Sequence, residues 1–414
     1  MDSNRSFFRY ENAIVLMMFF TFGFVFMERL SIVFLFPFIS QDLHLNNAQI
    51  GMITSVLAVT WAISGWVFGS LSDLSGSRKK ILLPITLAFS VLSFLSGVAK
   101  SFGSMLVVRG LMGLSEGPVL PIAQASVIAD SSEKRRGFNI GFVQSSLGLL
   151  GATITPIIVT AVAVKYSWHS AFYMVGIPGI VMFFVLWKYM REPKLTPEQD
   201  AVHGKVNRKD FAVVYRNRNV WLSSIISALF MTWLFVFTTF APVYLMTVDK
   251  FKAEEMGLIM AAIGFGSFVW GFVGPAISDK VGRKPTLIGF CLIAALSPIA
   301  LAVVHASVPV MMLLGFLTAV GQGCFPLFMA VIPGESLPFR FVATAVAMTQ
   351  FIGEIVGGTI TPTLAGFAAD AWGLQAPMWI AAGGAVLSAV VATGLKETAP
   401  ARVKTANLGG NVPA

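Results

Sequence analysis

Four charged residues lie inside segments that are otherwise apolar, and their types and spacing could do chemistry. Glu28 and Arg29 are adjacent, whereas Arg109 and Glu116 are seven residues apart, which is about two turns of a helix. Arg109 and Glu116 therefore share one helix face. A charge facing lipid is costly, so we expect all four to point into a bundle interior or a watery cavity and to interact with one another.

These residue types suit the joint binding of an organic anion and a proton. Arginine stays protonated and can hold a carboxylate through two parallel hydrogen bonds. A nearby arginine favours the ionised form of a glutamate. A substrate carboxylate that binds the arginine weakens this effect, so the glutamate becomes easier to protonate. Substrate and proton binding are then linked, as a symporter requires. The alternative is two buried ion pairs that only fix helix packing.

Small residues accompany the second charged pair. Gly110, Gly113 and Gly117 surround this part of the segment. Because glycine has no side chain, we expect a neighbouring helix or a ligand to approach closely here.

The composition places the chain in the membrane class. Hydrophobic residues make up 56% and charged residues 12% of 414, whereas soluble domains have about 25% charged residues. Apolar runs long enough to cross a bilayer recur twelve times, and each should be a helix because a lone strand cannot satisfy its backbone in lipid. The first run is too long for a cleavable signal peptide. The expected spans are residues 13–38, 48–72, 81–99, 102–129, 138–163, 168–190, 219–247, 255–278, 285–305, 308–333, 341–368 and 375–395.

The distribution of Lys and Arg predicts the orientation. Loops on the side of the termini carry 23 of the 29 Lys and Arg residues, the opposite loops carry four, and two lie within spans. Basic loops stay in the cytoplasm, so both termini should be cytoplasmic. The net charge of +9 then reflects membrane topology, and we expect no nucleic-acid partner.

The chain should be an all-α membrane protein with two pseudo-symmetric six-helix bundles. We expect the first bundle at 1–190, a cytoplasmic linker at 191–218, the second bundle at 219–398 and a cytoplasmic tail at 399–414. Similar Asp-containing loops follow spans two and eight, and Asp73 and Asp279 are 206 residues apart, about half the chain. A repeat of this kind predicts a transporter whose site lies between its halves.

Twelve spans, a basic central loop and this paired loop resemble the major facilitator superfamily over nearly the whole chain. Both loop copies depart from the family motif, with Leu74 in place of a basic residue and Pro275 in place of glycine. The resemblance implies a cytoplasmic gate that opens and closes with the transport cycle. Alternatively, these charges only set the topology. The gate residues would be Asp73, Arg78, Asp279 and Arg283.

Within that superfamily, Glu28-Arg29-Leu-Ser31 in span one, with Arg109 and Glu116 in span four, is similar to the anion:cation symporter family. Members of that family carry hexuronates, galactonate, phthalate, sialic acid or glutamate. The resemblance implies that Arg29 is the carboxylate ligand, that Glu28 and Glu116 carry protons and that Arg109 is their balancing partner. The family more often has Asp where this chain has Glu28.

Further substrate-binding candidates come from their positions in the spans. Trp61 lies in span two, where carriers of sugar acids in this family tend to have a pocket tyrosine, and Gln144 lies where the family has a polar pocket residue. Trp233 and Tyr244 belong to a segment that resembles the family's kinked Pro-x-Tyr helix. Each aromatic residue alone is more often a packing or interface residue. Gln350 is the last candidate, one turn before Glu354.

Glu354 is an acidic residue in span eleven that the family resemblance does not explain. It could be a third titratable group of the proton-coupling set, a cation site or a ligand for a substrate ammonium, or it could pair with a neighbouring polar group. No Lys or Arg lies inside a span of the second half, which argues against phosphate esters and favours a monocarboxylate.

The sequence predicts a secondary transporter that imports a small organic carboxylate, an organic or sugar acid, by proton symport through alternating access. Its partners would be the organic anion, protons and the lipid bilayer, with no cofactor or metal, and sodium is the alternative coupling ion. We expect a monomer in a bacterial inner membrane. The alternatives are a proton-coupled multidrug exporter of the same superfamily and a non-transporting membrane sensor. No nucleophile–base or metal motif indicates an enzyme.

Overall fold

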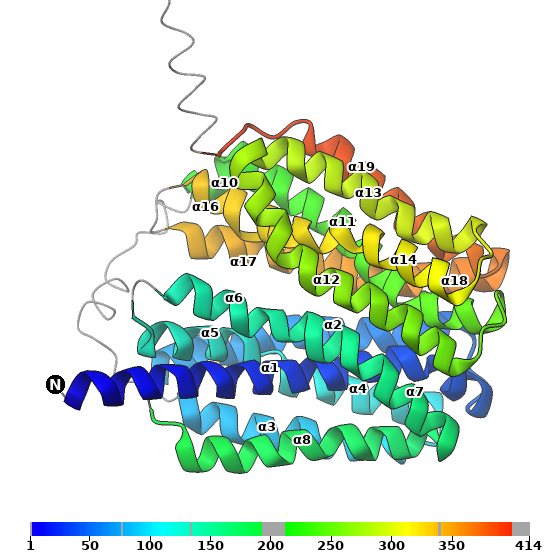
Figure 1. Ribbon diagram of the computed structural model, residues 1–414, viewed down its shortest axis with the longest axis horizontal. Helices are drawn as coiled ribbons and strands as arrows, with labels where there is room; N and C mark the ends of the chain where they lie inside the picture. Colours follow the sequence, from blue (N-terminus) through cyan, green and yellow to red (C-terminus); the bar gives the residue numbers. More distant parts are fainter. Residues whose placement is uncertain (1, 76–77, 133–134, 193–211, 338–340, 400–414) are drawn as a thin grey trace, which may run out of the picture. The chain divides into compact units, whose positions relative to one another are not determined.

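The computed structural model is built from helices (Figure 1). Twelve of its helical segments are long and apolar enough to cross a membrane. The predicted all-α, twelve-span architecture is therefore confirmed. The structure describes residues 2–75, 78–132, 135–192, 212–337 and 341–399, with the backbone alone at residues 2–9, 66, 69–75, 136–138, 212 and 342–343.

Spans one to six come from the first half of the sequence. Span four is broken between α4 and α5, and span five contains a π-helical turn, η1. The elements are α1 (Asp2–Asp42), α2 (Asn47–Ser75), α3 (Arg78–Gly97), α4 (Phe102–Glu116), α5 (Val119–Asp130), α6 (Arg136–Ser146), η1 (Leu147–Ile154), α7 (Thr155–Lys165) and α8 (Trp168–Tyr189).

Spans seven to twelve come from the second half, after the short helix α10 (Ala212–Arg216). Span ten is divided into five short helical pieces, and span eleven contains a second long π-helical turn, η6. The elements are α11 (Arg218–Thr247), α12 (Ala253–Val281), α13 (Arg283–Val303), α14 (Val308–Thr318), η3 (Ala319–Gly323), α15 (Cys324–Pro326), η4 (Leu327–Val331), α16 (Ile332–Glu335), α17 (Val342–Gly353), η6 (Glu354–Ile360), α18 (Thr361–Trp372) and α19 (Gln375–Ala392).

The chain forms two compact units, of which the first is residues 1–201 with Pro242–Phe265 and the second is residues 202–241 with 266–414. Pro242–Phe265 packs on span five through glycines. A Cβ at Gly264 would lie 2.0 Å from the carbonyl oxygen of Ala152, and one at Gly257 would lie 2.5 Å from Thr160 Oγ1. Most of the predicted linker 191–218 and tail 399–414 lies outside the described residues, so the predicted boundaries stay a prediction.

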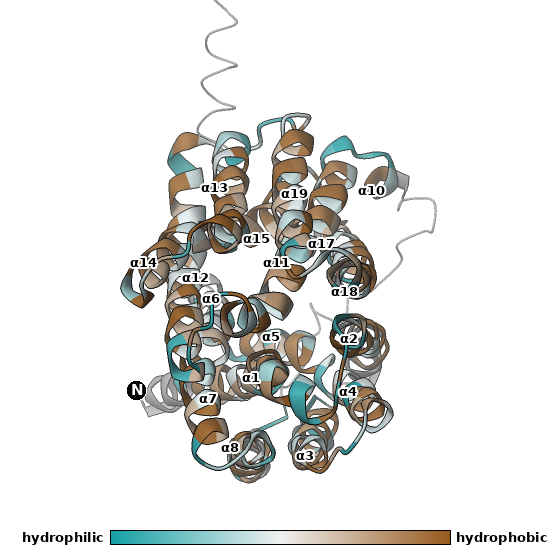
Figure 2. Ribbon diagram, turned by 90° about the vertical axis from the view of Figure 1, so that its right-hand side faces the viewer, coloured by the Kyte–Doolittle hydropathy of each residue, from teal (hydrophilic) through white to brown (hydrophobic). Residues whose placement is uncertain are grey.

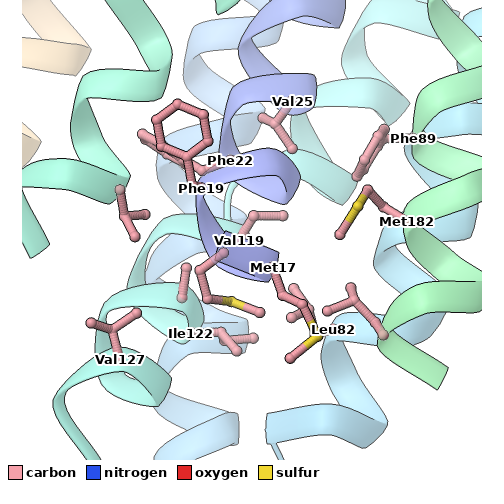
Figure 3. Close-up of a cluster of buried hydrophobic side chains, with 14 of the residues drawn as sticks. Met17, Phe19, Phe22, Val25, Leu82, Phe89, Val119, Ile122, Val127 and Met182 are labelled. Atoms are coloured by element: carbon pink, nitrogen blue, oxygen red, sulfur yellow. The ribbon is translucent and has the colours of Figure 1, made fainter. Parts of the chain in front are cut away.

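α1 lies at the centre of the first unit. Met17, Phe19 and Phe22 of this helix pack in one buried cluster with residues of α3, α5 and α8, among them Phe89 and Met182 (Figure 3). α3 lies beside α8 in both overall views (Figures 1 and 2). This packing fixes α1, which carries Glu28 and Arg29, against the helices around it.

Many large hydrophobic side chains are exposed on the helices, which fits a surface covered by lipid. Examples are Val107, Phe184 and Leu364, which are 62%, 57% and 57% exposed. Exposed Trp187 and Trp372 lie at helix ends, as aromatic residues of membrane interfaces do. Hydrophilic residues concentrate in the connecting loops (Figure 2). The chain is a multi-pass membrane protein.

Candidate functional site

The two charges of α1 point to different neighbours, because consecutive helix residues project about 100° apart. Glu28 is fully buried. Ser93 of α3 lies beside its carboxylate, although the Ser93 hydroxyl donates its hydrogen bond to the Phe172 carbonyl, 2.7 Å away. Arg29 is 6% exposed, and its guanidinium carbon lies 4.9 Å from the centre of the Trp61 ring. Trp61, predicted as a substrate contact, thus lies against the predicted carboxylate ligand.

Arg109 of α4 is fully buried and lies next to Glu28. Its Nη1 donates a long hydrogen bond, 3.5 Å, to the main-chain oxygen of Glu28, and its guanidinium carbon lies 5.0 Å from the centre of the Phe172 ring. Among the described residues, Nε and Nη2 have no hydrogen-bond partner. Part of the hydrogen-bonding capacity of this buried cation is therefore unused.

Glu116 is the last residue of α4 and is fully buried. The break at Gly117 and Pro118, before α5 begins at Val119, ends the helix here. Within the described chain, neither carboxylate oxygen of Glu116 or of Glu28 accepts a hydrogen bond. Buried acceptors without donors are rare in folded proteins and often mark sites of function.

All four charges interact within the first unit. Electrostatic interactions link Glu28 with Arg109 and Glu116, and they link Glu116 with Arg29 and Arg109. The structure thus brings together the two pairs that lie far apart in the sequence. Two carboxylates and two guanidinium groups, all buried in membrane spans, can bind an anion and protons.

A neighbouring helix was predicted to approach closely beside Arg109 and Glu116, and in the structure this helix is α2. A Cβ at Gly113 would lie 2.2 Å from Thr60 Oγ1 and 2.4 Å from the Leu57 carbonyl oxygen. A Cβ at Gly117 would lie 2.2 Å from the Trp61 carbonyl oxygen. Ser64 Oγ donates across the same contact to the Gly113 carbonyl, 3.0 Å away. The glycines therefore hold Trp61, and through it Arg29, close to span four.

Alanine at Gly117 should destabilise the protein, because the new methyl group would meet backbone atoms of α2 that cannot move independently. We expect overpacking to cost about 1–3 kcal/mol, measured as a lower midpoint of thermal unfolding in detergent. Gly110→Ala is the matched control, since a Cβ there would meet only Val56 Cγ2 at 3.5 Å. Equal midpoints for the two variants would show that the contact is not tight.

Gln144 and Tyr244 are the other predicted substrate contacts that lie in the first unit. Gln144 lies near the end of α6, three residues before η1, and is exposed. Tyr244 lies two residues after Pro242 in α11 and is fully buried. Their roles as substrate contacts stay predictions.

Trp233, Gln350 and Glu354 lie in the second unit. The indole N–H of Trp233 donates to the Ala294 carbonyl at 2.9 Å, so a substrate could meet only its ring. Gln350 is half-buried, and its main-chain carbonyl accepts a hydrogen bond from the main-chain N–H of Glu354. Glu354 opens η6 and is 5% exposed. A Cβ at Gly358 would lie 2.9 Å from Glu354 Oε2.

Comparison with known proteins identifies the fold family. A model of the Major Facilitator Superfamily matches residues 16–356 and 251–412. The chain belongs to the major facilitator superfamily. It is a transporter and not an enzyme, as the sequence predicted.

Three relatives are similar to this major facilitator at 24–28% identity. The hexuronate transporter of Bacillus subtilis is 28% identical over 376 residues, covering 86% of this chain and 87% of that protein. The probable 4-methylmuconolactone transporter of Cupriavidus pinatubonensis is 26% identical over 332 residues, covering 78% and 76%. The probable L-galactonate transporter of Escherichia coli is 24% identical over 397 residues, covering 87% and 84%.

Solved structures of the superfamily share the fold of this major facilitator. A bacterial homolog of the human lysosomal transporter Spinster, in an inward-facing and unoccupied conformation, has a TM-score of 0.73 at 19% identity and covers 93% of this chain and 95% of that one. The nucleoside transporter NupG has a TM-score of 0.72 at 16% identity and covers 92% and 98%.

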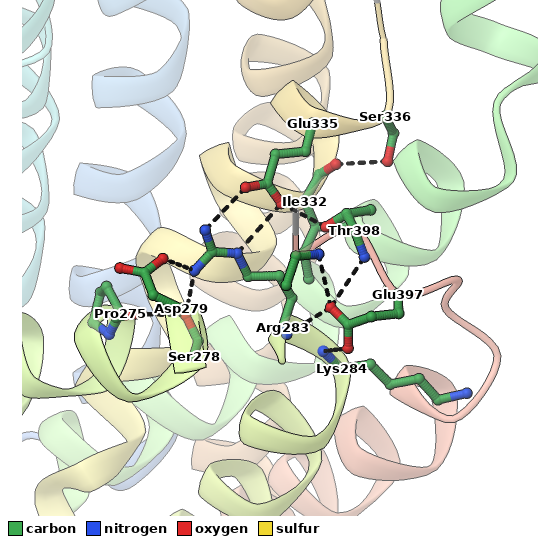
Figure 4. Close-up of polar contacts among 11 residues, drawn as sticks. Pro275, Ser278, Asp279, Arg283, Lys284, Ile332, Glu335, Ser336, Glu397 and Thr398 are labelled. Atoms are coloured by element: carbon green, nitrogen blue, oxygen red, sulfur yellow. Dashed lines mark hydrogen bonds and ion pairs between the residues drawn. The ribbon is translucent and has the colours of Figure 1, made fainter. Parts of the chain in front are cut away.

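The predicted gate residues Asp279 and Arg283 meet at the loop between α12 and α13 (Figure 4). Arg283 pairs with Asp279 and donates to Ser278 Oγ at 2.6 Å. It also pairs with Glu335 at the end of α16, with 2.9 Å between Nη2 and Oε1. Arg283 thus ties span nine to span ten as well as to span eight.

Glu397, just after span twelve, completes this cluster, and sequence reasoning missed it. Its carboxylate accepts from the main-chain N–H groups of Arg283 at 2.8 Å and Lys284 at 3.2 Å, at the start of α13. Thr398 Oγ1 donates to Glu335 Oε2 at 2.6 Å (Figure 4). A carboxylate at a helix N-terminus is favourable. The polar Lys-Glu-Thr sequence at 396–398, which follows the last span, was the sequence feature that could have indicated this residue.

The first half has a related arrangement at Lys79. The main-chain N–H of Lys79, in the first turn of α3, donates to Glu192 at 3.2 Å, and its Nζ donates to the Trp187 and Met190 carbonyls at 2.7 and 2.6 Å. The predicted gate residue Arg78 instead donates to the Ala125 carbonyl of α5 at 2.7 Å. Only the backbone of Asp73 is described, so its role as a gate residue stays a prediction.

Removing the guanidinium of Arg283 should slow transport and destabilise the second unit, because Glu335 and Asp279 would lose their shared cation. We expect Arg283→Gln to cost about 1–3 kcal/mol of unfolding free energy and to lower the maximal uptake rate, both measured against the parent. Lys284→Gln is the matched control, because its side chain extends away from the cluster (Figure 4). If both variants behave alike, the cluster has no special role.

A second polar cluster, also missed from sequence, anchors the start of span one. Glu11 is 1% exposed, and its Oε1 accepts from the main-chain N–H and the hydroxyl of Ser132, both at 3.2 Å, and from Asn139 Nδ2 at 3.0 Å. In the second half, Asn217, 206 residues after Glu11, donates to the Ser336 carbonyl at 2.9 Å. Each half thus ties the start of its first span to the turn between its fourth and fifth spans.

Proposed function

We propose that this major facilitator imports a small organic carboxylate together with protons by alternating access. The observation that carries the proposal is the buried group of Glu28, Arg29, Arg109 and Glu116 in one unit. Buried charges of both signs in membrane spans are costly, and they mark substrate or proton pathways far more often than packing alone. An anion carrier needs a cation for its substrate and acids for its protons.

Arg29 is the proposed ligand of the substrate carboxylate. Its guanidinium can form two parallel hydrogen bonds with a carboxylate, and the Trp61 ring at 4.9 Å supports its plane through a cation–π interaction. This support holds the arginine in place before the substrate arrives, which lowers the entropic cost of binding. Trp61 is proposed to flank the substrate, and Gln144, Trp233, Tyr244 and Gln350 are the further proposed contacts.

Glu28 and Glu116 are the proposed proton carriers, and Arg109 is their balancing cation. Both carboxylates are fully buried, and no hydrogen bond from the described residues reaches their oxygens. A proton would neutralise each group where it lies, which suits carboxylates that must repeatedly lose and regain charge within the membrane. Glu354 stays a predicted third acid of this set, with a cation site, a ligand for a substrate ammonium group or a pairing with a polar neighbour as the alternatives.

The substrate class is proposed from the relatives together with the charges. Hexuronate and L-galactonate, the named substrates of two relatives, are sugar acids with one carboxylate and several hydroxyl groups. A carboxylate is the group that Arg29 is suited to bind. We therefore place the substrate among the organic and sugar acids, with a monocarboxylate preferred.

The proposed setting is a bacterial inner membrane with both termini in the cytoplasm. The excess of Lys and Arg in the loops on the side of the termini supports this orientation. Asp73, Arg78, Asp279 and Arg283 then lie on the cytoplasmic side, where they are proposed to act as a gate. The protein is proposed to work as a monomer, with protons as the coupling ion in preference to sodium.

A ligand panel tests the proposed substrate class. The midpoint of thermal unfolding of the purified protein should rise with one or more small carboxylates, because ligand at 100 times its Kd stabilises the folded state by about 2.7 kcal/mol. Lipophilic cations should have no effect. The opposite pattern would indicate the multidrug exporter, and stabilisation by carboxylates without solute uptake into liposomes would indicate the sensor.

A further inference from the structure

The chain has two cysteines, and they contact each other inside the second unit. Cys291 lies in α13, which is span nine, and Cys324 is the first residue of α15 in span ten. Both side chains are fully buried. Their sulfur atoms lie 3.8 Å apart, close enough for a weak S–H···S hydrogen bond. The packing of two spans thus brings together thiols that are 33 residues apart in the sequence.

Glycines beside Cys324 hold span ten tightly against span nine. A Cβ at Gly321 would lie 2.8 Å from Ala294 Cβ of α13. A Cβ at Gly323 would lie 3.0 Å from Phe290 Cε2 of the same helix. Cys291 lies three residues before Ala294, so both residues lie on one face of α13. The contact between the sulfur atoms is therefore part of a close contact between the two spans.

Cys324 lies where span ten changes its helical form. The 3-10 turn η3 ends at Gly323, and the π-helical turn η4 follows directly after α15; we call residues 319–331 the joint of span ten. A 3-10 stretch inside a helix often marks a hinge, and π-helical turns occur frequently at functional sites. Gly323 and Cys324 also correspond to Gly117 and Pro118, 206 residues earlier, where span four breaks. The two thiols therefore connect an unbroken helix, α13, to a segment that can bend.

We propose that Cys291 and Cys324 form a redox-sensitive pair, which a lipid-soluble quinone oxidises to a disulfide that holds the joint against span nine. The S–S distance in a disulfide is about 2.0 Å, roughly half the present separation of 3.8 Å. Rotation of the two short side chains and a small shift of the joint can supply this approach. The inference goes beyond the proposed function and does not depend on it.

The proposed oxidation transfers two electrons. Each sulfur loses its proton, and one S–S bond forms between the two sulfur atoms. The two electrons and two protons pass to the quinone, which becomes a hydroquinone. A dithiol reverses the reaction, because its thiolate attacks one sulfur of the disulfide and forms a mixed disulfide that the second thiol then resolves.

The location of the pair determines which oxidant can reach it. Both cysteines lie within membrane-spanning helices and have no exposed surface, and thiols buried in apolar surroundings react slowly. A water-soluble oxidant such as glutathione disulfide stays outside the hydrocarbon core, whereas a quinone dissolves in it. Because the sulfur atoms are covered, we expect the quinone to react when the joint moves away from α13.

Thiol labelling of the full-length protein in liposomes tests whether the bond forms. The oxidant is duroquinone, a benzoquinone whose ring has no unsubstituted position for a thiol to add to. N-ethylmaleimide is added after the protein has been unfolded. The untreated protein should take up two maleimides, one at each cysteine, and the oxidised protein none while it stays a monomer. Dithiothreitol should restore both labels, and glutathione disulfide should leave the protein reduced.

Hydrogen–deuterium exchange tests whether the bond holds the joint. In the oxidised parent the amides of residues 319–331 should exchange at least about tenfold more slowly, because a covalent cross-link opposes the local opening that exposes them. Dithiothreitol should restore the faster exchange. Exchange at η1, residues 147–154 of the first unit, should stay within about twofold. Neither measurement needs a transport substrate.

Cys291→Ala and Cys324→Ala are the matched controls. Each variant keeps one thiol, so duroquinone should change neither its labelling nor the exchange of residues 319–331. The decisive comparison is between the oxidised and the reduced parent, so a variant that folds poorly does not affect the conclusion.

Four results would overturn the inference. Two maleimides on the parent after duroquinone would show that the cysteines only pack in the core. A covalent dimer would show that the thiols pair between molecules. A disulfide without slower exchange at residues 319–331 would show that the bond does not hold the joint. Equal oxidation by glutathione disulfide would contradict the assignment of a lipid-soluble oxidant.

Discussion

Arg29→Ala is expected to abolish the stabilisation of the purified protein by its carboxylate substrate. The variant loses the only group proposed to form paired hydrogen bonds with the carboxylate. Truncating one partner of a buried charged pair costs about 2–5 kcal/mol, which is roughly 30-fold to several-thousand-fold in Kd. The measurement is the shift of the unfolding midpoint with ligand concentration, in parent and variant.

Two further variants keep this experiment interpretable. Arg29→Lys retains the charge but loses the planar fork, so its Kd should fall between those of the parent and the alanine variant. Trp61→Leu removes the ring that supports the guanidinium at 4.9 Å and should weaken binding by the smaller amount of a cation–π contact, about 0.5–2 kcal/mol. Undiminished ligand stabilisation in Arg29→Ala would remove Arg29 from the site.

Glu116→Gln is expected to uncouple substrate movement from the proton gradient. The amide has nearly the shape of a protonated carboxyl group but cannot release a proton. Accumulation driven by a pH gradient should fall to the level reached without a gradient, because a carrier in which substrate and proton binding are no longer linked cannot use the gradient. Exchange of labelled for unlabelled substrate, which needs no net proton movement, should continue. Liposomes that contain the purified protein allow both measurements.

Glu28→Gln provides the comparison for this prediction, since both oxygens of Glu28 are also buried without donors in the described chain. If both acids carry protons, both variants should keep exchange and lose accumulation. Loss of exchange together with accumulation would instead point to a role in substrate binding or folding. Full accumulation in both variants would contradict the proposed coupling.

The twelve spans could be predicted because lipid imposes a simple rule on sequence. A helix that crosses the membrane must be long and apolar, so spans such as 168–190 and 375–395 agree with α8 and α19 within a few residues. The proximity of Arg109 and Glu116 also follows from helical periodicity. The interaction of this pair with Glu28 and Arg29 was expected from the cost of buried charge, and the structure brings the four charges close enough to interact electrostatically.

The positions of the π-helical turns within spans five and eleven could not be predicted from the sequence. The π-helical turns η1 and η6 end just before the Thr-Pro pairs at 155–156 and 361–362, and proline alone does not say which turn of a helix will widen. The repeated Thr-Ile-Thr-Pro was nevertheless visible in the chain. It recurs at the period of 206 residues that also separates Asp73 and Asp279, and an internal repeat of this kind predicts two segments that fold alike.

Contacts that depend on tertiary packing could not be predicted from the sequence either. Trp233 could be assigned to span seven, but its bond to the Ala294 carbonyl depends on how α11 and α13 pack. Glu397 and Glu11 follow or precede the apolar part of a span and looked like polar ends. The first caps α13, and the second is 1% exposed and holds the turn at Ser132. Burial of a residue near a chain end cannot be inferred from its polarity.

Proton movement in liposomes that contain only the purified protein tests the central claim most directly. A pH-sensitive dye inside the liposomes reports protons that enter when a carboxylate is added outside. Carboxylate:proton symport predicts acidification of the interior that requires the carboxylate and is absent in Arg29→Ala. Carboxylate entry without acidification, or proton release driven by lipophilic cations, would contradict it.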